Sequence, residues 1–149
     1  MTAPTLVLAW GNASRGDDAL GPQFADALRG EAGDRFELLD DYQLQIEHAL
    51  DLVGRRRVLF VDASLSCAAP FEVRALQPAR DTSFTSHALS PAAVMQVYRE
   101  LQGAEPPPCT QLSIRGERFE LGEPLGAAAS AHLAAALDWA RRWLAEGPG

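Results

Sequence analysis

Residues 5–21 read TLVLAWGNASRGDDALG, and this stretch decides the fold. Its first six residues are an unbroken apolar run, which is typical of a strand buried on both faces of a sheet. A turn with glycines and acids follows, and Pro22 then suits the first position of a helix over residues 22–28. The chain therefore opens with a strand, an acidic loop and a helix.

Strand and helix signals alternate along the rest of the chain. Apolar runs and one stretch of period-two alternation predict strands over residues 36–39, 58–61, 71–76 and 110–114. Helical periodicity, with caps at Gly54 and at Ser90-Pro91, predicts helices over residues 44–53, 91–101 and 125–144. Residues 119–121 either extend the sheet or lie over it.

The alternation predicts a three-layer α/β fold. Only residues 63–70 separate the third and fourth strands, and a parallel crossover needs about a dozen residues or more. The fourth strand is therefore predicted to run antiparallel to the third, which makes the sheet mixed. The length of the chain and the lack of repeats predict one domain over residues 1–149.

The composition argues against several functions. The formal net charge is −7, whereas binding to duplex nucleic acid needs clustered Lys and Arg. No apolar run approaches the roughly 20 residues that cross a bilayer, and the N-terminus lacks the pattern of a signal peptide. We expect a monomeric cytoplasmic protein that does not bind membranes, in which Cys67 and Cys109 stay reduced and separate.

Three ligand-type side chains lie at positions that could converge. Asp18 lies in the loop after the first strand, Asp62 ends the third strand, and His87 lies in a polar loop before the helix at residue 91. Ligands in open α/β sheets usually sit at the carboxyl ends of strands. Two carboxylates and an imidazole suit Ni, Zn, Fe or Mn and leave coordination positions open.

Each of these side chains also has a simpler explanation. Asp17 and Asp18 precede a helix, where acids commonly complement the helix dipole. Asp62 could cap the backbone of the following loop, and His87 could be an ordinary loop histidine. Two further histidines fall on predicted helices, where surface or half-buried positions explain them: His48 and His132. The metal hypothesis depends on convergence of the three residues.

Residues 11–21, with Gly-Asn, four residues and then Asp-Asp-Ala-Leu-Gly, resemble the opening motif of the nickel–iron hydrogenase maturation endopeptidases. Residues 61–63 and 86–87 match that family in order and approximate spacing. The resemblance implies a twisted five-stranded sheet between helices. It also implies an endopeptidase that clips a C-terminal extension from a hydrogenase large-subunit precursor, with nickel arriving in that substrate. By motif position the nickel ligands fall on Asp18, Asp62 and His87.

The chain departs from the family at two places. Many members carry Glu at the position of Asp18, and Asp is one methylene shorter. Many members also have Asp-Gly-Gly-Thr-x-Gly after the second strand, where this chain reads DDYQLQ over residues 40–45.

Residues 42–47 are more similar to the His-Gln-Leu-x-Pro-Glu element of one branch of the family. That branch serves soluble, NAD-linked or bidirectional hydrogenases. Here Tyr42 replaces the His and Ile46 replaces the Pro. The resemblance implies that Asp40 faces the metal or the peptide and that Gln43 belongs to the substrate-binding element. A turn-forming role is the simpler alternative for Asp40.

The sequence does not identify a catalytic nucleophile or base, because no Ser or Cys near the motifs has an assignable partner. We therefore expect metal-assisted hydrolysis, with the metal or a carboxylate beside it polarising the carbonyl or activating water. A non-catalytic nickel-sensing chaperone or checkpoint protein that binds the metal-loaded large subunit is the alternative. A nucleotide-binding domain ranks last, since the loop over residues 11–21 has no Lys and two acids.

Overall fold

The computed structural model describes residues 2–80 and 89–148, and its centre is a mixed five-stranded sheet in the order β2-β1-β3-β5-β4. Four strands run parallel, and β4 pairs antiparallel with β5. The bounds are β1 Thr5–Trp10, β2 Phe36–Asp41, β3 Arg57–Ser64, β4 Phe71–Ala75 and β5 Cys109–Arg115. The predicted fold class is confirmed.

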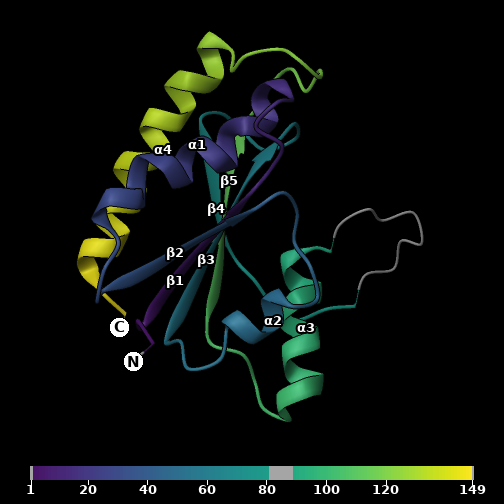
Figure 1. Cartoon of the computed structure of the whole chain (residues 1–149), viewed down its shortest axis with the longest axis vertical. Coiled ribbons are helices and arrows are strands. Elements are labelled where there is room, and N and C mark those ends of the chain that lie inside the picture. The colour runs from purple at the N-terminus through teal and green to yellow at the C-terminus, as the bar shows by residue number, and fades with distance from the viewer. Residues whose placement is uncertain (1, 81–88, 149) are drawn as a thin grey trace.

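Helices cover both faces of the sheet, so the fold has three layers (Figure 1). One face carries α1, Leu20–Leu28, and α4, Ala127–Glu146, and the other carries α2, His48–Asp51, and α3, Pro91–Gln102. Successive strand residues point to opposite faces. Leu59 and Val61 therefore join the core under α1 and α4, and Phe60 joins the core under α2 and α3.

Short 3₁₀ helices flank α1, over Gly16–Ala19 and Arg29–Glu31. The predicted cap of α3 is confirmed, because the Ser90 side chain accepts a hydrogen bond from the Ala93 N–H at 3.1 Å. Both cysteines are free and buried. None of the described helices is long and apolar enough to cross a bilayer.

One local expectation is confirmed and another is wrong. β4 runs antiparallel to β3 as predicted, but β5 lies between them, because buried β5 takes a central position and exposed β4 takes the edge. The helix predicted over residues 44–53 is reduced to His48–Asp51, because the His48 Nδ1 atom accepts the Gln45 backbone N–H at 2.8 Å and holds a turn there. Residues 119–121 form no strand.

Candidate functional site

The strand order creates a crevice at the carboxyl ends of β1 and β3. From β1 the chain crosses to β2 on one side, and from β2 it returns past β1 to β3 on the other side. Connections from the two strands therefore leave in opposite directions, which is where open α/β sheets bind ligands. Asp18 follows β1 and Asp62 lies near the end of β3, so both predicted ligands belong to this switch point.

Close backbone packing brings Asp18 back toward the end of β1. A Cβ atom on Gly11 would meet the carbonyl oxygen of Asp18, and a Cβ atom on Gly21 would meet the carbonyl oxygen of Trp10. These glycines let the loop and the start of α1 lie directly against β1. The Asn12 backbone N–H then donates to Asp18 Oδ2 at 2.8 Å, and Asp18 Oδ1 has no hydrogen-bond partner among the described residues.

We expect Gly21→Ala to destabilise the fold although Gly21 is helical. Alanine normally stabilises a helix relative to glycine, by about 1 kcal/mol. Here the new methyl group would meet the Trp10 carbonyl, and such overpacking costs about 2 kcal/mol. Gly30→Ala is the matched control, because nothing lies within 4 Å of its Cβ position. Urea unfolding of both variants measures the difference, and equal stabilities would contradict this account of the loop.

Asp62 is a half-buried carboxyl group held from one side. Gln111 Nε2 donates to Asp62 Oδ1 at 3.2 Å, and Oδ2 has no hydrogen-bond partner among the described residues. The pKa of Asp62 is raised to about 7, chiefly by burial; the hydrogen bond from Gln111 and the charge of Arg74 oppose the rise, and the negative charge of Asp18 adds to it. The two carboxyl groups are therefore close enough to interact electrostatically.

The simpler explanation of Asp62 as a loop cap does not hold. The cap of that loop is Ser64, whose Oγ accepts the Ser66 N–H at 3.2 Å and the Cys67 N–H at 3.1 Å. Burial also raises the pKa of the Cys67 thiol, which disfavours the nucleophilic thiolate. Ser64 and Cys67 thus serve the loop and the core, in agreement with the lack of an assignable nucleophile in the sequence.

Asp17, the neighbour of Asp18, has a structural role that the sequence did not reveal. Its side chain is 2% exposed and accepts the backbone N–H groups of Glu117 at 2.7 Å, Arg118 at 3.1 Å and Gly126 at 2.9 Å. Burial would raise the pKa of Asp17, but these three hydrogen bonds bring it below its ordinary value. Asp17 therefore fixes a distant segment to the acidic loop.

Tyr42 and Asn12 join two loops at the same end of the sheet. Asn12 Nδ2 donates to the Tyr42 hydroxyl oxygen at 2.7 Å, so the residue that follows β2 contacts the loop that holds Asp18. The neighbouring Asp41 carboxylate lies 3.2 Å from His48 Nε2. His48 is thus buried and paired within the protein, rather than at the surface or half-buried as the simpler explanation had it. His132 likewise pairs with the Arg115 carbonyl, at 2.9 Å.

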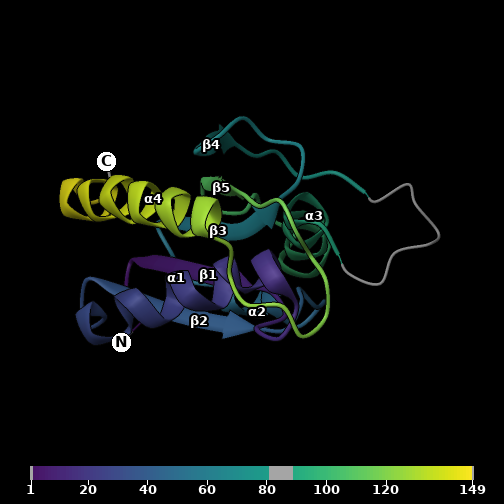
Figure 2. The same cartoon turned by 90° about the horizontal axis from the view of Figure 1, so that it is seen from above.

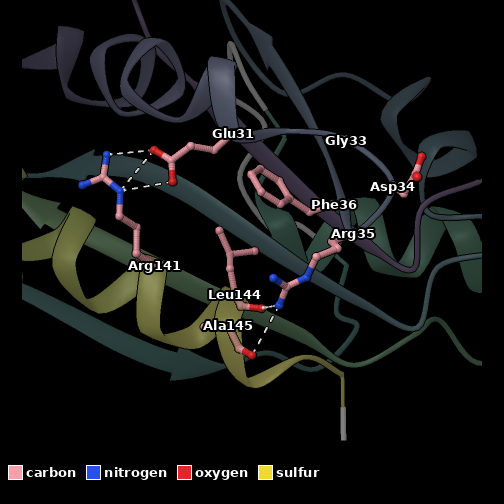
Figure 3. Close-up of a pocket in the computed structure, with 8 residues that line it drawn as sticks. All are labelled: Glu31, Gly33, Asp34, Arg35, Phe36, Arg141, Leu144 and Ala145. Atoms are coloured by element: carbon pink, nitrogen blue, oxygen red, sulfur yellow. Dashed lines mark hydrogen bonds and ion pairs between the residues drawn. The ribbon is translucent and has the colours of Figure 1, made fainter.

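A cavity lies at the other end of the sheet, and neither Asp18 nor Asp62 lines it (Figure 3). It has a volume of about 390 Å³ and is lined by the start of β2 and the end of α4. Arg141 forms an ion pair with Glu31 at 3.1 Å, and Arg35 donates to the carbonyls of Leu144 and Ala145. These contacts fasten the last turn of α4 to the sheet, which explains the cavity as a structural junction.

Solved structures show what the chain is similar to, although no family model and no curated protein matches it. The hydrogenase maturating endopeptidase HybD from E. coli is 26% identical, with a TM-score of 0.76 over 98% of this chain and 93% of that one. The chain is therefore similar over almost its whole length to a hydrogenase maturation endopeptidase. The resemblance and the enzyme class expected from the sequence, an endopeptidase, are thereby confirmed.

Two archaeal hydrogenase maturation endopeptidases share the fold at lower identity. HycI from Thermococcus kodakarensis KOD1 is 19% identical, with a TM-score of 0.72 over 95% of this chain and 92% of that one. A hydrogenase 2 maturation peptidase from a Thaumarchaeota archaeon is 20% identical, with a TM-score of 0.69 over 94% of this chain and 97% of that one. These two likenesses establish the architecture alone.

The structure places two of the five predicted site residues, Asp18 and Asp62, at the same end of the sheet and near enough to interact electrostatically. Asp40, at the end of β2, forms an exposed ion pair with Arg29 at 3.3 Å, and Gln43 is half-buried after β2. His87 lies outside the described residues. Within residues 2–80 and 89–148, no three His, Cys, Asp or Glu side chains cluster as metal ligands would, so the three-residue site stays a prediction.

Proposed function

We propose that the chain removes the C-terminal extension of a nickel–iron hydrogenase large-subunit precursor in the cytoplasm, after nickel has been inserted. The observation that carries this proposal is the placement of Asp18 and Asp62 at the switch point of a fold shared with a hydrogenase maturating endopeptidase, near enough to interact electrostatically. Nickel enters as part of the substrate, and Asp18, Asp62 and His87 are its proposed protein ligands.

The two carboxyl groups fit a divalent cation. Each uses one oxygen in a hydrogen bond inside the protein, Asp18 with the Asn12 backbone and Asp62 with Gln111, and each keeps a second oxygen. Burial is the main reason that the pKa of Asp62 is near 7, and repulsion by the ionised Asp18 adds to it. A cation between them would favour both ionised forms. Bound nickel would hold the precursor peptide in register beside the scissile carbonyl.

Co-expression with a nickel-loaded precursor tests the proposal. We expect the wild-type chain to shorten the precursor, and Asp18→Asn, Asp62→Asn and His87→Ala each to leave it uncut, because each removes a ligand atom. Mass spectrometry of the precursor's C-terminus gives the result. Asp40→Asn tests the substrate-binding prediction separately, since Asp40 lies on the neighbouring strand and pairs with Arg29.

The outcomes separate the two candidate functions. Normal processing by all three ligand variants would contradict the metal site. A wild-type chain that binds the nickel-loaded precursor and leaves its C-terminus intact would favour the non-catalytic checkpoint protein. A nickel-free precursor is the control for timing, and its cleavage at the same rate would contradict nickel as the signal of completion.

A further inference from the structure

The segment between β5 and α4, residues 116–126, packs against the loop that carries Asp18, and we call this segment the wall (Figure 2). Buried Asp17 holds the wall in place. The contact is reinforced along the backbone. The Gly16 N–H donates to the Glu123 carbonyl at 2.9 Å, and the Gly122 N–H donates to the Ser14 carbonyl at 2.7 Å. Gly16 has φ +56°, and a Cβ atom there would meet the Arg118 carbonyl. Two segments about 100 residues apart in the chain are thus built into one surface.

A cavity of about 540 Å³ opens in this surface beside the candidate site. Asn12 lies on its lining and also holds Asp18 through its backbone N–H, so the cavity adjoins the acidic loop directly. Two apolar side chains at its rim are unusually exposed, Leu121 at 77% and Tyr42 at 63%. Its full lining is Asn12, Arg15, Tyr42, Phe119, Glu120 and Leu121.

The charged groups of the cavity are not neutralised inside the protein. Arg15 Nε donates to the Phe119 carbonyl at 2.7 Å, which fixes the side chain. Among the described residues, the two terminal nitrogens of Arg15 have no acceptor, and Arg15 forms no ion pair with neighbouring Glu120. The Tyr42 hydroxyl accepts from Asn12 and keeps its own proton for donation. A fixed guanidinium with free N–H groups suits a carboxylate.

We propose that this cavity is a docking subsite for the large-subunit precursor, in which Arg15 binds an acidic side chain of the peptide and Leu121 and Tyr42 pack against an apolar neighbour. The inference rests on the proposed function and adds the chemistry of the segment that is recognised. The wall held by Asp17 keeps these groups beside Asp18, so a peptide seated in the cavity extends toward the candidate metal ligands.

The test measures binding of the nickel-loaded precursor to immobilised protein, with KM and kcat for processing measured in parallel. We expect Arg15→Gln and Leu121→Ala each to weaken binding about tenfold and to raise KM with little change in kcat, because they remove uniform binding. Glu120→Gln acts in the opposite direction and strengthens binding, since it removes an acid that repels the peptide. Added salt reduces the effects of Arg15→Gln and Glu120→Gln but not that of Leu121→Ala.

Matched controls lie on distant surfaces. Leu101→Ala removes another exposed leucine side chain, on α3, and Arg142→Gln removes an exposed cation on α4. Both should bind as wild type does. Arg15→Gln removes a hydrogen bond to the wall and could loosen it. Leu121→Ala does not have this effect, because Leu121 is exposed, so it tests the subsite independently.

Each result decides. Wild-type affinity and KM in both Arg15→Gln and Leu121→Ala overturn the subsite while processing by wild type upholds the proposed function. If the wild-type protein binds the precursor without cleaving it, the proposed function is overturned. The affinities of Arg15→Gln and Leu121→Ala then still show whether the cavity binds the precursor. Neither binding nor cleavage by wild type overturns both.

Discussion

Asp62→Asn abolishes removal of the C-terminal extension and, above neutral pH, makes the folded protein more stable than wild type. Loss of processing follows from the role proposed for Asp62, because an amide is a far poorer ligand for a divalent cation than a carboxylate. Gain of stability follows from the pKa of Asp62, which burial raises to about 7. A residue that serves function at a cost in stability is common at active sites.

The sign of the effect on stability follows from proton binding. The unfolded carboxyl group has a pKa of 3.8 and the folded one about 7, so between these values the folded state binds more protons. The contribution of Asp62 is therefore greatest at low pH, and the free energy of unfolding falls as the pH rises toward 7. The full shift corresponds to about 4 kcal/mol, and partial solvent exposure reduces this to about 2 kcal/mol. The amide in Asp62→Asn cannot ionise, so the free energy of unfolding of this variant does not fall in the same way as the pH rises.

Urea unfolding at an acidic and an alkaline pH measures this contribution. We expect the stability advantage of Asp62→Asn over wild type to be small at about pH 5 and to grow to about 2 kcal/mol above pH 8. Asp138→Asn, at an exposed position on α4, should show no such growth and should process the precursor normally. An inactive Asp62→Asn with no pH-dependent gain would leave the ligand role intact and contradict the raised pKa of Asp62 in the folded protein.

The parts of the site that the sequence predicted are those attached to strand ends. Apolar runs locate β1 and β3, and parallel strands end at the same edge, so the approximate positions of Asp18 and Asp62 follow from local pattern. The same reasoning gave the mixed sheet, because the connection before β4 is too short for a parallel crossover. The position of β5 between β3 and β4 was not predictable from the sequence, because the order of strands depends on how whole strands are buried and not on local sequence pattern.

The supporting contacts of the site carry no comparable signal. Gln111 reaches Asp62 across the β3–β5 pairing, and Asn12 reaches Tyr42 across two loops, so each depends on a tertiary register. Asp17 is the extreme case, because its partners are backbone N–H groups, which every residue except proline possesses. The sequence alone therefore does not show that Asp18 is a candidate ligand while its neighbour Asp17 is a structural anchor; only the folded structure separates the two roles.

Asp17→Ala should cause the largest loss of stability among the variants considered. It removes the buried acceptor of three backbone N–H groups, those of Glu117, Arg118 and Gly126. Hydrogen bonds to a charged group are worth about 1.5–3 kcal/mol each and are not additive, so we expect a loss of about 4 kcal/mol. Asp26→Ala is the control, because its ion pair with Arg29 at 3.0 Å is exposed and contributes at most about 1 kcal/mol.

The pH dependence of this loss distinguishes an anchoring carboxylate from simple packing. Burial opposes ionisation of Asp17, but the three N–H donors lower its folded pKa below 3.8, the unfolded value. Its stabilising contribution is then complete above about pH 4 and disappears as the pH falls through the folded pKa. The gap between wild type and Asp17→Ala should be constant near neutrality and shrink in acid. A gap that keeps its size in acid would assign the loss to the missing volume of the side chain. Because Asp17 also holds the wall of the cavity beside Asp18, Asp17→Ala should raise KM for the precursor even where the protein stays folded.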